Sequence, residues 1–257
     1  MAMEKLCSLL FELSNEDRLR ILHKVEEESL RLTHVAEKLD LTVQETSRHL
    51  SRLSEEKLVQ RGADGLYRLT AYGEHAVRLL PGLRFLSEHG EYFATHNTSH
   101  LPDEFVKRIG DLANCTFTDD VMEAFHIVES LIQEAREYVW ILTDQILMST
   151  LPFLEEAIKR GVAFRLIVPE DMVPPPDFKP IPGVTDLIKR RTLKRVDAVM
   201  TISEKLARVA FPTVEGRMDY IGFGSTDESS YGWCRELLLY YWERSEPGKP
   251  KGYPPLH

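Results

Sequence analysis

Apolar residues recur at intervals of three and four through the first part of the chain, and this period predicts a series of short amphipathic helices. The apolar positions are Leu6, Leu9, Leu10, Leu13, Leu19, Leu22, Val25, Val35, Ala36 and Leu39. Ser14 with Asp17 has the spacing of a helix start, and Thr33 is a further N-cap candidate. We therefore expect three helices before residue 40.

The segment LTVQETSRHLSRLSEEKLVQR, residues 41–61, predicts a fourth helix with two unlike faces. The apolar face holds Val43, Thr46, Leu50 and Leu53, with His49 packed at its edge. The other face is mostly short and hydrogen-bonding, and it consists of Gln44, Ser47, Arg48, Ser51, Arg52 and Glu55. A solvated surface helix is usually laced with alternating charges, so this face favours entry into a nucleic-acid groove.

The elements around this helix predict a winged helix. Residues 40–42 form a short break after the third helix, and Thr42 with Glu45 has the pattern of a capping box. Two short helices joined in this way make a helix-turn-helix. The run KLVQRGADGLYRLT follows directly, and its turn at residues 62–65 between alternating segments predicts a β-hairpin.

Strand and helix patterns alternate in the rest of the chain, which predicts an α/β layer domain. Strands are expected at EYVWILTD, VAFRLIVPE, VDAVMTIS and RMDYIGFGS, and helices at STLPFLEEAIKRG and DESSYGWCRELLLYYWERS. A helix after residue 73 is expected to be interrupted at Pro81-Gly82, before the polar segment THNTSH. The expected domains are 1–75 (winged helix-turn-helix), 76–110 (linker helix and junction), 111–245 (α/β effector domain) and 246–257 (disordered tail).

Composition places limits on partners. The net charge is −9 over 257 residues, and residues 1–80 hold 12 Lys and Arg against 14 Asp and Glu, or −2. Any DNA-binding surface must therefore be a local basic patch. The chain has no apolar run of membrane-spanning length and no signal-peptide pattern, and its three cysteines are far apart. We expect a cytoplasmic protein with no membrane contact and with structural thiols.

Residues 33–73 resemble the winged-helix domain shared by ArsR-like regulators. The matching residues are Ser47, His49, Leu50, Leu53, Leu58-Val59, Leu69-Thr70 and Gly73, while Lys57 stands where many relatives have glycine. The resemblance implies that Gln44, Ser47, Arg48, Ser51 and Arg52 face the major groove. Thr42 and Ser47 suit phosphate contacts near the helix N-terminus. Arg61, Tyr67 and Arg68 would lie on the wing beside the DNA backbone or minor groove.

The later residues resemble a degenerate phospholipase-D-like domain. The match rests on the segment from IQEAREYVWILTD to KRGVAFRLIV and on the loop GFGSTDESS, where Asp227 replaces the usual Asn. Catalytic members need His-x-Lys, and none of the nine histidines is followed two positions later by Lys. No Gly-rich phosphate loop, G-x-S-x-G or HExxH is present either. We therefore expect no enzymatic activity and no cofactor.

The two parts together resemble archaeal transcriptional regulators of the methanogenesis-regulator group, with the TrmB-like regulators as more distant relatives. The resemblance implies a dimer that binds double-stranded DNA and responds to a small effector. Candidate dimer surfaces are the leucines at 6, 10 and 13 and the final helix. Effector-binding candidates are Asp144, Arg190, Arg191 and Ser225, because open α/β sheets bind ligands at strand ends and the run KRRTLKR suits an anion.

Two alternatives remain at this point. His96 and His100 are four residues apart with His89 before them, so a metal-sensing regulator is conceivable, although THNTSHLP is a poor helix. A protein-interaction module that does not bind DNA is the other. The basic run at 189–195 can also be interpreted without an anionic ligand, as a solvated helix face or an aid to dimer or DNA contact.

Overall fold

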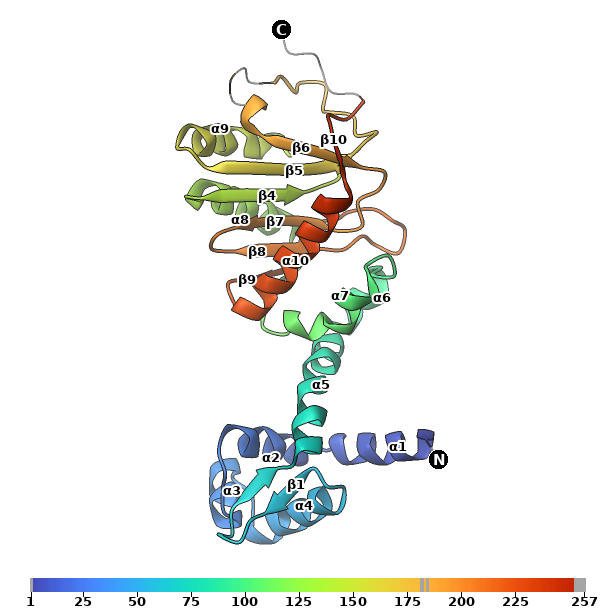
Figure 1. The fold of residues 1–257 in the computed structure, drawn as a ribbon, viewed down its shortest axis with the longest axis vertical. Helices are drawn as coiled ribbons and strands as arrows, with labels where there is room; N and C mark the ends of the chain where they lie inside the picture. The colour runs from blue at the N-terminus through green and yellow to red at the C-terminus, as the bar shows by residue number, and fades with distance from the viewer. Residues whose placement is uncertain (1, 181–182, 184, 252–257) are drawn as a thin grey trace. The chain divides into compact units, whose positions relative to one another are not determined.

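The computed structural model describes residues 2–180, 183 and 185–251, which form two compact units, Met1–Leu83 and Arg84–His257. The first unit is the predicted winged helix (Figure 1). It consists of α1 (Ala2–Leu13), α2 (Glu16–Glu27), α3 (Leu32–Leu39), α4 (Val43–Glu55), β1 (Val59–Arg61), β2 (Tyr67–Leu69) and the first part of α5 (Ala71–Glu88). Leu22, Leu50 and Leu58 are fully buried in its core.

Two residues in the left-handed region end the helices of the helix-turn-helix. Asp40 (φ 54°) caps α3, and Lys57 (φ 62°) ends α4 before the wing. A left-handed conformation favours glycine, which explains why relatives place glycine where Lys57 stands. Gly73 lies so close to β1 that a Cβ atom would sit 2.0 Å from the Leu58 carbonyl oxygen. Among the matched motif residues, Gly73 is thus required by the close approach of the Leu58 backbone.

The second unit is an α/β domain, so the fold-class prediction is confirmed. Its elements are α6 (Gly90–Thr95), α7 (Asp103–Lys107), η1 (Ile109–Leu112), β3 (Thr116–Thr118), α8 (Val121–Glu134), β4 (Tyr138–Leu142), η2 (Met148–Thr150), α9 (Leu151–Lys159), β5 (Ala163–Pro169), η3 (Thr185–Leu187), β6 (Lys189–Leu193), β7 (Val199–Ser203), β8 (Ala207–Ala210), β9 (Gly222–Ser225), α10 (Glu228–Arg244) and β10 (Glu246–Pro247).

The strands pair in one sheet in the order β10-β6-β5-β4-β7-β8-β9-β3 over the described residues. Only β4, β5 and β6 are parallel, and the other pairs are antiparallel. Helices α8 and α9 cover one face, and α10 covers the other (Figure 1). The α8–α9 face is closed by a cluster that includes Ile132 and Val139, and the α10 face by one that includes Trp233.

Two expectations about secondary structure are wrong. The basic run 189–195 is not a helix face, because Lys189–Leu193 forms β6 between β5 and β10. Helix α5 continues through Pro81, and the burial of Val77 on one side and Phe85 on the other offsets the backbone hydrogen bond lost at the proline. Both helix halves thus have a core to pack against.

The expected linker and tail also differ from the structure. The polar segment THNTSH lies inside the second unit, where His96 pairs with Thr213 and the Asn97 N–H donates to the Pro212 carbonyl at 2.7 Å. The tail is ordered at Glu246–Pro247, which pairs with β6, while residues 252–257 lie outside the described residues. No helix in the described part of the chain is long and apolar enough to span a membrane.

Candidate nucleic-acid interface and effector cavity

Helix α4 exposes the polar face that the sequence predicts. Gln44, Ser47, Arg48 and Ser51 are exposed, while Thr46, His49, Leu50 and Leu53 are buried. Burial lowers the pKa of His49, whose Nε2 lies 3.8 Å from an Asp17 carboxylate oxygen. Arg48 forms no ion pair with any described residue, so its guanidinium is available to a partner.

The N-terminus of α4 is fixed by its capping box. The Thr42 hydroxyl accepts from the Glu45 N–H at 3.2 Å and donates to the Glu45 carboxylate at 2.6 Å. These hydrogen bonds lower the pKa of Glu45. Both hydrogen bonds of the Thr42 hydroxyl are therefore made within the helix. A phosphate contact of Thr42, as predicted, would have to use its backbone.

Arg52 does not join the exposed face. Its Nε donates to a Glu12 carboxylate oxygen of α1 at 3.0 Å, and its guanidinium lies 5.3 Å from the Phe11 ring centroid. Glu12 is buried, and the hydrogen bond from Arg52 lowers the pKa of its carboxyl group. Arg52 therefore ties α1 to α4, which the spacing of residues along α4 could not reveal.

The wing presents one basic side chain without an acidic partner. Arg61 is exposed and lies 6.0 Å from the Tyr67 ring centroid. Arg68 instead forms an ion pair with Asp64 in the turn, and this pairing holds the pKa of Asp64 at about 2. Leu30 pairs with Tyr67 through two backbone hydrogen bonds, which adds a bridge to the hairpin.

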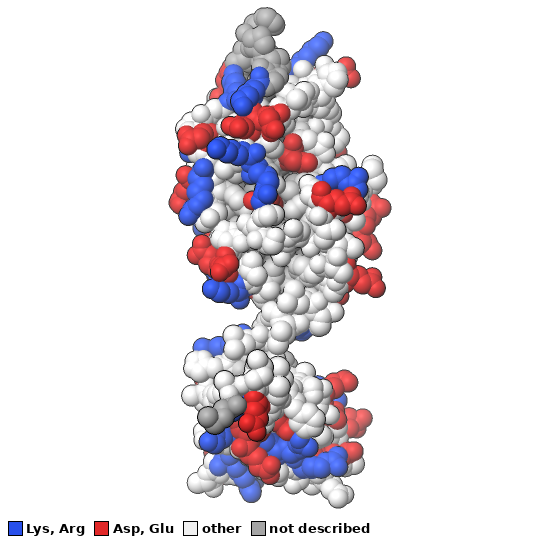
Figure 2. Space-filling view, turned by 90° about the vertical axis from the view of Figure 1, so that its right-hand side faces the viewer, with Lys and Arg blue, Asp and Glu red and all other residues white. Residues whose placement is uncertain are grey.

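Two exposed residues next to this face were missed by the sequence argument. Val43 was assigned to the apolar face but is 55% exposed, because it stands at the first position of the helix. Lys57 is exposed at the turn between α4 and the wing. Basic and acidic side chains are interspersed on the visible face of this unit (Figure 2), so the candidate interface is local, as the net charge requires.

The four effector candidates are not gathered at one site. Asp144 follows β4 and accepts from the Tyr220 hydroxyl at 2.5 Å, while Arg190 lines a cavity that Tyr220 also lines. Arg191 donates to the Ser245 hydroxyl at 2.8 Å and stacks on Trp242, so its side chain has a structural role. Asp144 and Arg190 therefore remain as candidates near the cavity.

Ser225 does not lie at the end of the sheet where Asp144 follows β4. Strand β9 is antiparallel to β8, β8 to β7, and β7 to β4, so the carboxyl end of β9 is at the opposite edge of the sheet from that of β4. Ser225 accepts the Asp227 N–H at 2.9 Å beside the start of α10. Tyr220, and not Ser225, contacts Asp144 after the carboxyl end of β4.

The cavity itself lies between the sheet and helices α8 and α9. It has about 880 Å³ of empty space, part of it open to solvent. Its walls are predominantly apolar, with a few hydroxyl, amide and basic side chains. It is lined by Val128, Ile132, Ile141, Thr143, Gln145, Ile146, Leu147, Thr150, Leu151, Leu154, Leu166, Phe178, Lys179, Thr185, Ile188, Arg190, Val199, Thr201 and Tyr220.

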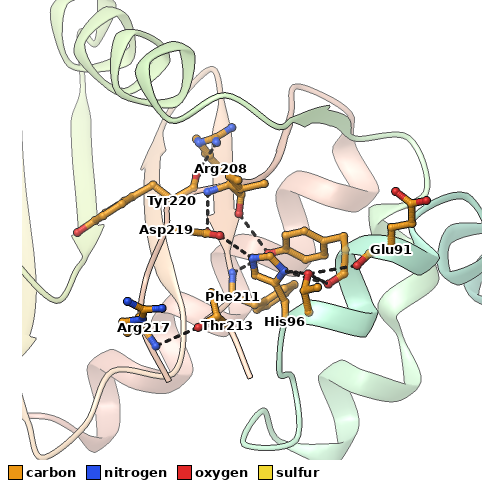
Figure 3. Close-up of polar contacts among 11 residues, drawn as sticks. Glu91, His96, Arg208, Phe211, Thr213, Arg217, Asp219 and Tyr220 are labelled. Carbon is orange, nitrogen blue, oxygen red and sulfur yellow. Dashed lines mark hydrogen bonds and ion pairs between the residues drawn. The ribbon is translucent and has the colours of Figure 1, made fainter. Parts of the chain in front are cut away.

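Two of the three histidines considered for a metal pack within the second unit, and the third, His100, is exposed. His96 is buried, stacks on the Tyr92 ring at 3.8 Å between centroids and places Nε2 3.0 Å from an Asp219 carboxylate oxygen (Figure 3). His89 packs against Phe85 and Phe223. Among the described residues no three His, Cys, Asp or Glu side chains are grouped as metal ligands. The histidine spacing therefore reflects packing of α6 against the sheet.

The cysteines are free and lie in different surroundings. Cys7 is exposed, which does not fit the expectation that all three thiols are structural, whereas Cys234 is buried. Burial raises the pKa of the Cys115 thiol to about 11. The two thiols of the second unit are thus inert packing groups at neutral pH.

No protein-family model matches the chain, and no curated protein matches it. Among solved structures, it is similar to TrmBL2, an archaeal chromatin protein (13% identity, 86% of this chain and 88% of that chain, TM-score 0.40). A homodimeric winged helix-turn-helix DNA-binding domain from Mycobacterium bovis is 21% identical (34% of this chain, 82% of that chain, TM-score 0.31). Nuc, a phospholipase D family member from Salmonella typhimurium, is 11% identical (53% and 97%, TM-score 0.36).

Proposed function

We propose that the chain is a sequence-specific DNA-binding transcriptional regulator. The observation that carries the proposal is the exposed face of α4, where Gln44, Ser47, Arg48 and Ser51 project from a capped helix over a hydrophobic core. Arg and Gln form bidentate hydrogen bonds with guanine and adenine edges. Ser47 lies near the helix N-terminus, which favours phosphate. Val43 adds an apolar surface suited to a thymine methyl group.

The wing supplies the second contact in this proposal. Arg61 and Tyr67 would lie beside the DNA backbone or minor groove, while Arg68 would first have to leave Asp64. Thr42 and Arg52 would not contact bases in this proposal. Thr42 caps the N-terminus of α4, and Arg52 holds α4 against α1. Lys57 extends the basic surface toward the phosphates.

The proposal is tested by fluorescence anisotropy of the full chain on labelled DNA recovered from a random pool. We expect selective binding whose affinity falls steeply with salt, because each phosphate contact releases counterions. A scrambled duplex of equal length is the control. A folded protein that binds neither duplex at low salt contradicts the proposal and favours a winged helix that contacts protein.

The exposed apolar face of α1 supports homodimerisation through the winged-helix unit. Helix α1 extends away from the rest of its unit (Figure 1), and Met3, Leu6, Leu10 and Phe11 are between 44% and 70% exposed. Leu13 is buried within the chain instead, and the apolar residues of the final helix, α10, pack on the sheet. A contiguous apolar surface of this kind is typical of an interface. A second copy of the same face would cover it and place two α4 helices for two half-sites.

Replacing Leu6 and Leu10 by glutamate is expected to weaken dimerisation by at least tenfold. Two charges would have to be buried without partners in the interface, while neither residue belongs to the core of its own unit. Light scattering coupled to size exclusion at several concentrations measures the change. Leu79→Glu, which alters a 76% exposed residue on α5, is the matched control. An unchanged dimer in the double variant would exclude α1 as the interface.

The second unit is proposed to regulate rather than catalyse. Its cavity between the sheet and α8–α9 has mostly apolar walls with a few polar side chains, a composition typical of small-molecule sites. The chain also lacks the His-x-Lys pattern of catalytic phospholipase-D-like domains. Effector binding would change DNA affinity by favouring one arrangement of the dimer.

A further inference from the structure

A buried arginine in the second unit makes hydrogen bonds only to neutral groups. Arg208 of β8 is only 4% exposed, and its guanidinium donates to the Thr118 hydroxyl at 3.2 Å. It also donates to the Tyr220 carbonyl at 2.8 Å (Figure 3). No ion pair joins it to a carboxylate anywhere in residues 2–180, 183 and 185–251. Burial lowers the pKa of this guanidinium and the more distant charge of Glu123 on α8 only partly opposes it, but arginine remains protonated in proteins. A buried charge held only by neutral acceptors is costly.

Arg208 lies on the wall of a small cavity that adjoins the main one. The two cavities share Val128, Val199, Thr201 and Tyr220 as wall residues. Tyr220 bridges them directly: its carbonyl accepts from Arg208, and its hydroxyl donates to Asp144 and accepts from the Gln145 amide at 2.6 Å. Tyr220 adopts φ 66°, a strained conformation for a bulky residue, and such residues cluster at ligand sites.

The strand register connects Arg208 with the floor of the main cavity. Directly paired residues run across five strands as Arg190, Leu166, Ile141, Thr201 and Arg208. Paired residues point to the same face of a sheet, so all five face α8 and α9. Neighbouring strands are about 4.8 Å apart, so the two arginine Cα atoms are separated by roughly 19 Å. The row is thus apolar at Leu166 and Ile141, carries one hydroxyl group at Thr201 and is cationic at both ends.

The two arginines differ in their surroundings. Arg190 donates to the Thr185 carbonyl and is half-buried on the wall of the main cavity. Arg208 is enclosed by Thr118, Tyr220 and the apolar side chains of α8. A buried charged group binds a carboxylate more strongly than an exposed one, because water screens it less. Arg208 is therefore the better anchor for a ligand's charge.

We propose that the second unit binds a small apolar carboxylic acid, with its carboxylate at Arg208 and its hydrocarbon body on Ile141 and Leu166 beneath α8 and α9. A sugar suits this cavity less well than an apolar acid, because Leu166 and Ile141 on its floor offer no polar partners for hydroxyl groups. The identification of this acid as the effector rests on the proposed function. The binding site itself does not, because it lies entirely within the second unit.

The test compares decanoate with decan-1-ol, which share a hydrocarbon chain but differ in charge. Isothermal titration calorimetry on the full chain is expected to give at least tenfold tighter binding of decanoate. Arg208→Met keeps the side-chain stem and is expected to remove that preference while decan-1-ol still binds. Arg208→Lys should retain part of it. Arg235→Met changes an exposed arginine on the α10 face and is expected to leave both affinities unchanged.

A second variant tests the site independently, in case Arg208→Met does not fold. Leu154→Trp fills the main cavity from α9 without touching Arg208, and it is expected to weaken both probes by at least tenfold. The proposal is overturned if wild-type protein binds neither probe, or if decanoate keeps its preference in folded Arg208→Met. DNA binding is not part of this measurement, so failure here leaves the winged-helix proposal standing, and failure to bind DNA leaves the acid site standing.

Discussion

Replacing Arg48 by alanine is expected to lower the affinity for the selected DNA by at least about 30-fold. Arg48 is exposed on α4 and has no ion pair among the described residues, so its loss removes a contact without exposing a buried partner. A bidentate contact with a base contributes about 1–3 kcal/mol of discrimination, and a dimer makes it twice. Anisotropy titrations of the variant against the selected and scrambled duplexes measure both affinity and specificity.

Two further variants separate base reading from charge. Arg48→Lys keeps the charge but loses the planar fork, so it should bind both duplexes with similar affinity. Arg78→Ala removes an exposed positive charge from α5 and is the matched control. Equal losses in Arg78→Ala and Arg48→Ala would mean that only net charge matters, and the α4 face would then not be the recognition surface.

The winged helix could be predicted from the sequence because its signals are local. The apolar period identifies the buried positions Thr46, Leu50 and Leu53, and the Thr42–Glu45 capping box marks the start of α4. Caps and periods involve residues within one or two turns, so they are visible along the chain. Arg52 was misplaced because its partner, Glu12, is forty positions away on another helix.

The sheet was predicted less completely for a related reason. Strand β8 is short and carries Arg208 in its interior, so the segment ARVA shows no clear apolar run. Ser225 was misplaced because strand direction depends on the order of pairing, and a strand's own residues do not encode it. Arg208 itself could not be identified as a site residue from the sequence, since its significance depends on its burial and on hydrogen bonds to neutral groups of distant segments.

Replacing Glu12 by alanine is expected to destabilise the winged-helix unit by about 3 kcal/mol. Glu12 is buried between two arginines: Arg18, with Nε at 3.1 Å, and Arg52, with Nε at 3.0 Å. The Arg18 side chain is only 7% exposed, so removal of the carboxylate leaves a buried charge unpaired, a change that costs several kcal/mol. Arg52 is partly exposed and regains water, which limits the loss.

The protein offers a direct way to assign this loss to one unit. Trp140, Trp233 and Trp242 all belong to the second unit, whereas helical circular dichroism reports on both. In urea, Glu12→Ala should lower the midpoint of a helical transition that tryptophan fluorescence does not follow. Glu37→Ala, which removes an exposed carboxylate on α3, is expected to change neither. A tryptophan transition that moves as far as the helical one would place the effect outside the winged helix.

The loss of stability in Glu12→Ala is expected to depend on pH, in a direction that follows from the Glu12 pKa. The hydrogen bond from Arg52 and the charge of Arg18 lower this pKa in the folded state below its value in the unfolded chain, about 4.3. The ion cluster therefore stabilises the fold above that unfolded value, and its contribution is lost as the pH falls through the lower folded value. The difference in unfolding free energy between wild type and Glu12→Ala should be largest at neutral pH and shrink on acidification. A difference that stayed constant below pH 4 would mean that side-chain packing, and not the carboxylate charge, joins α1 to α4.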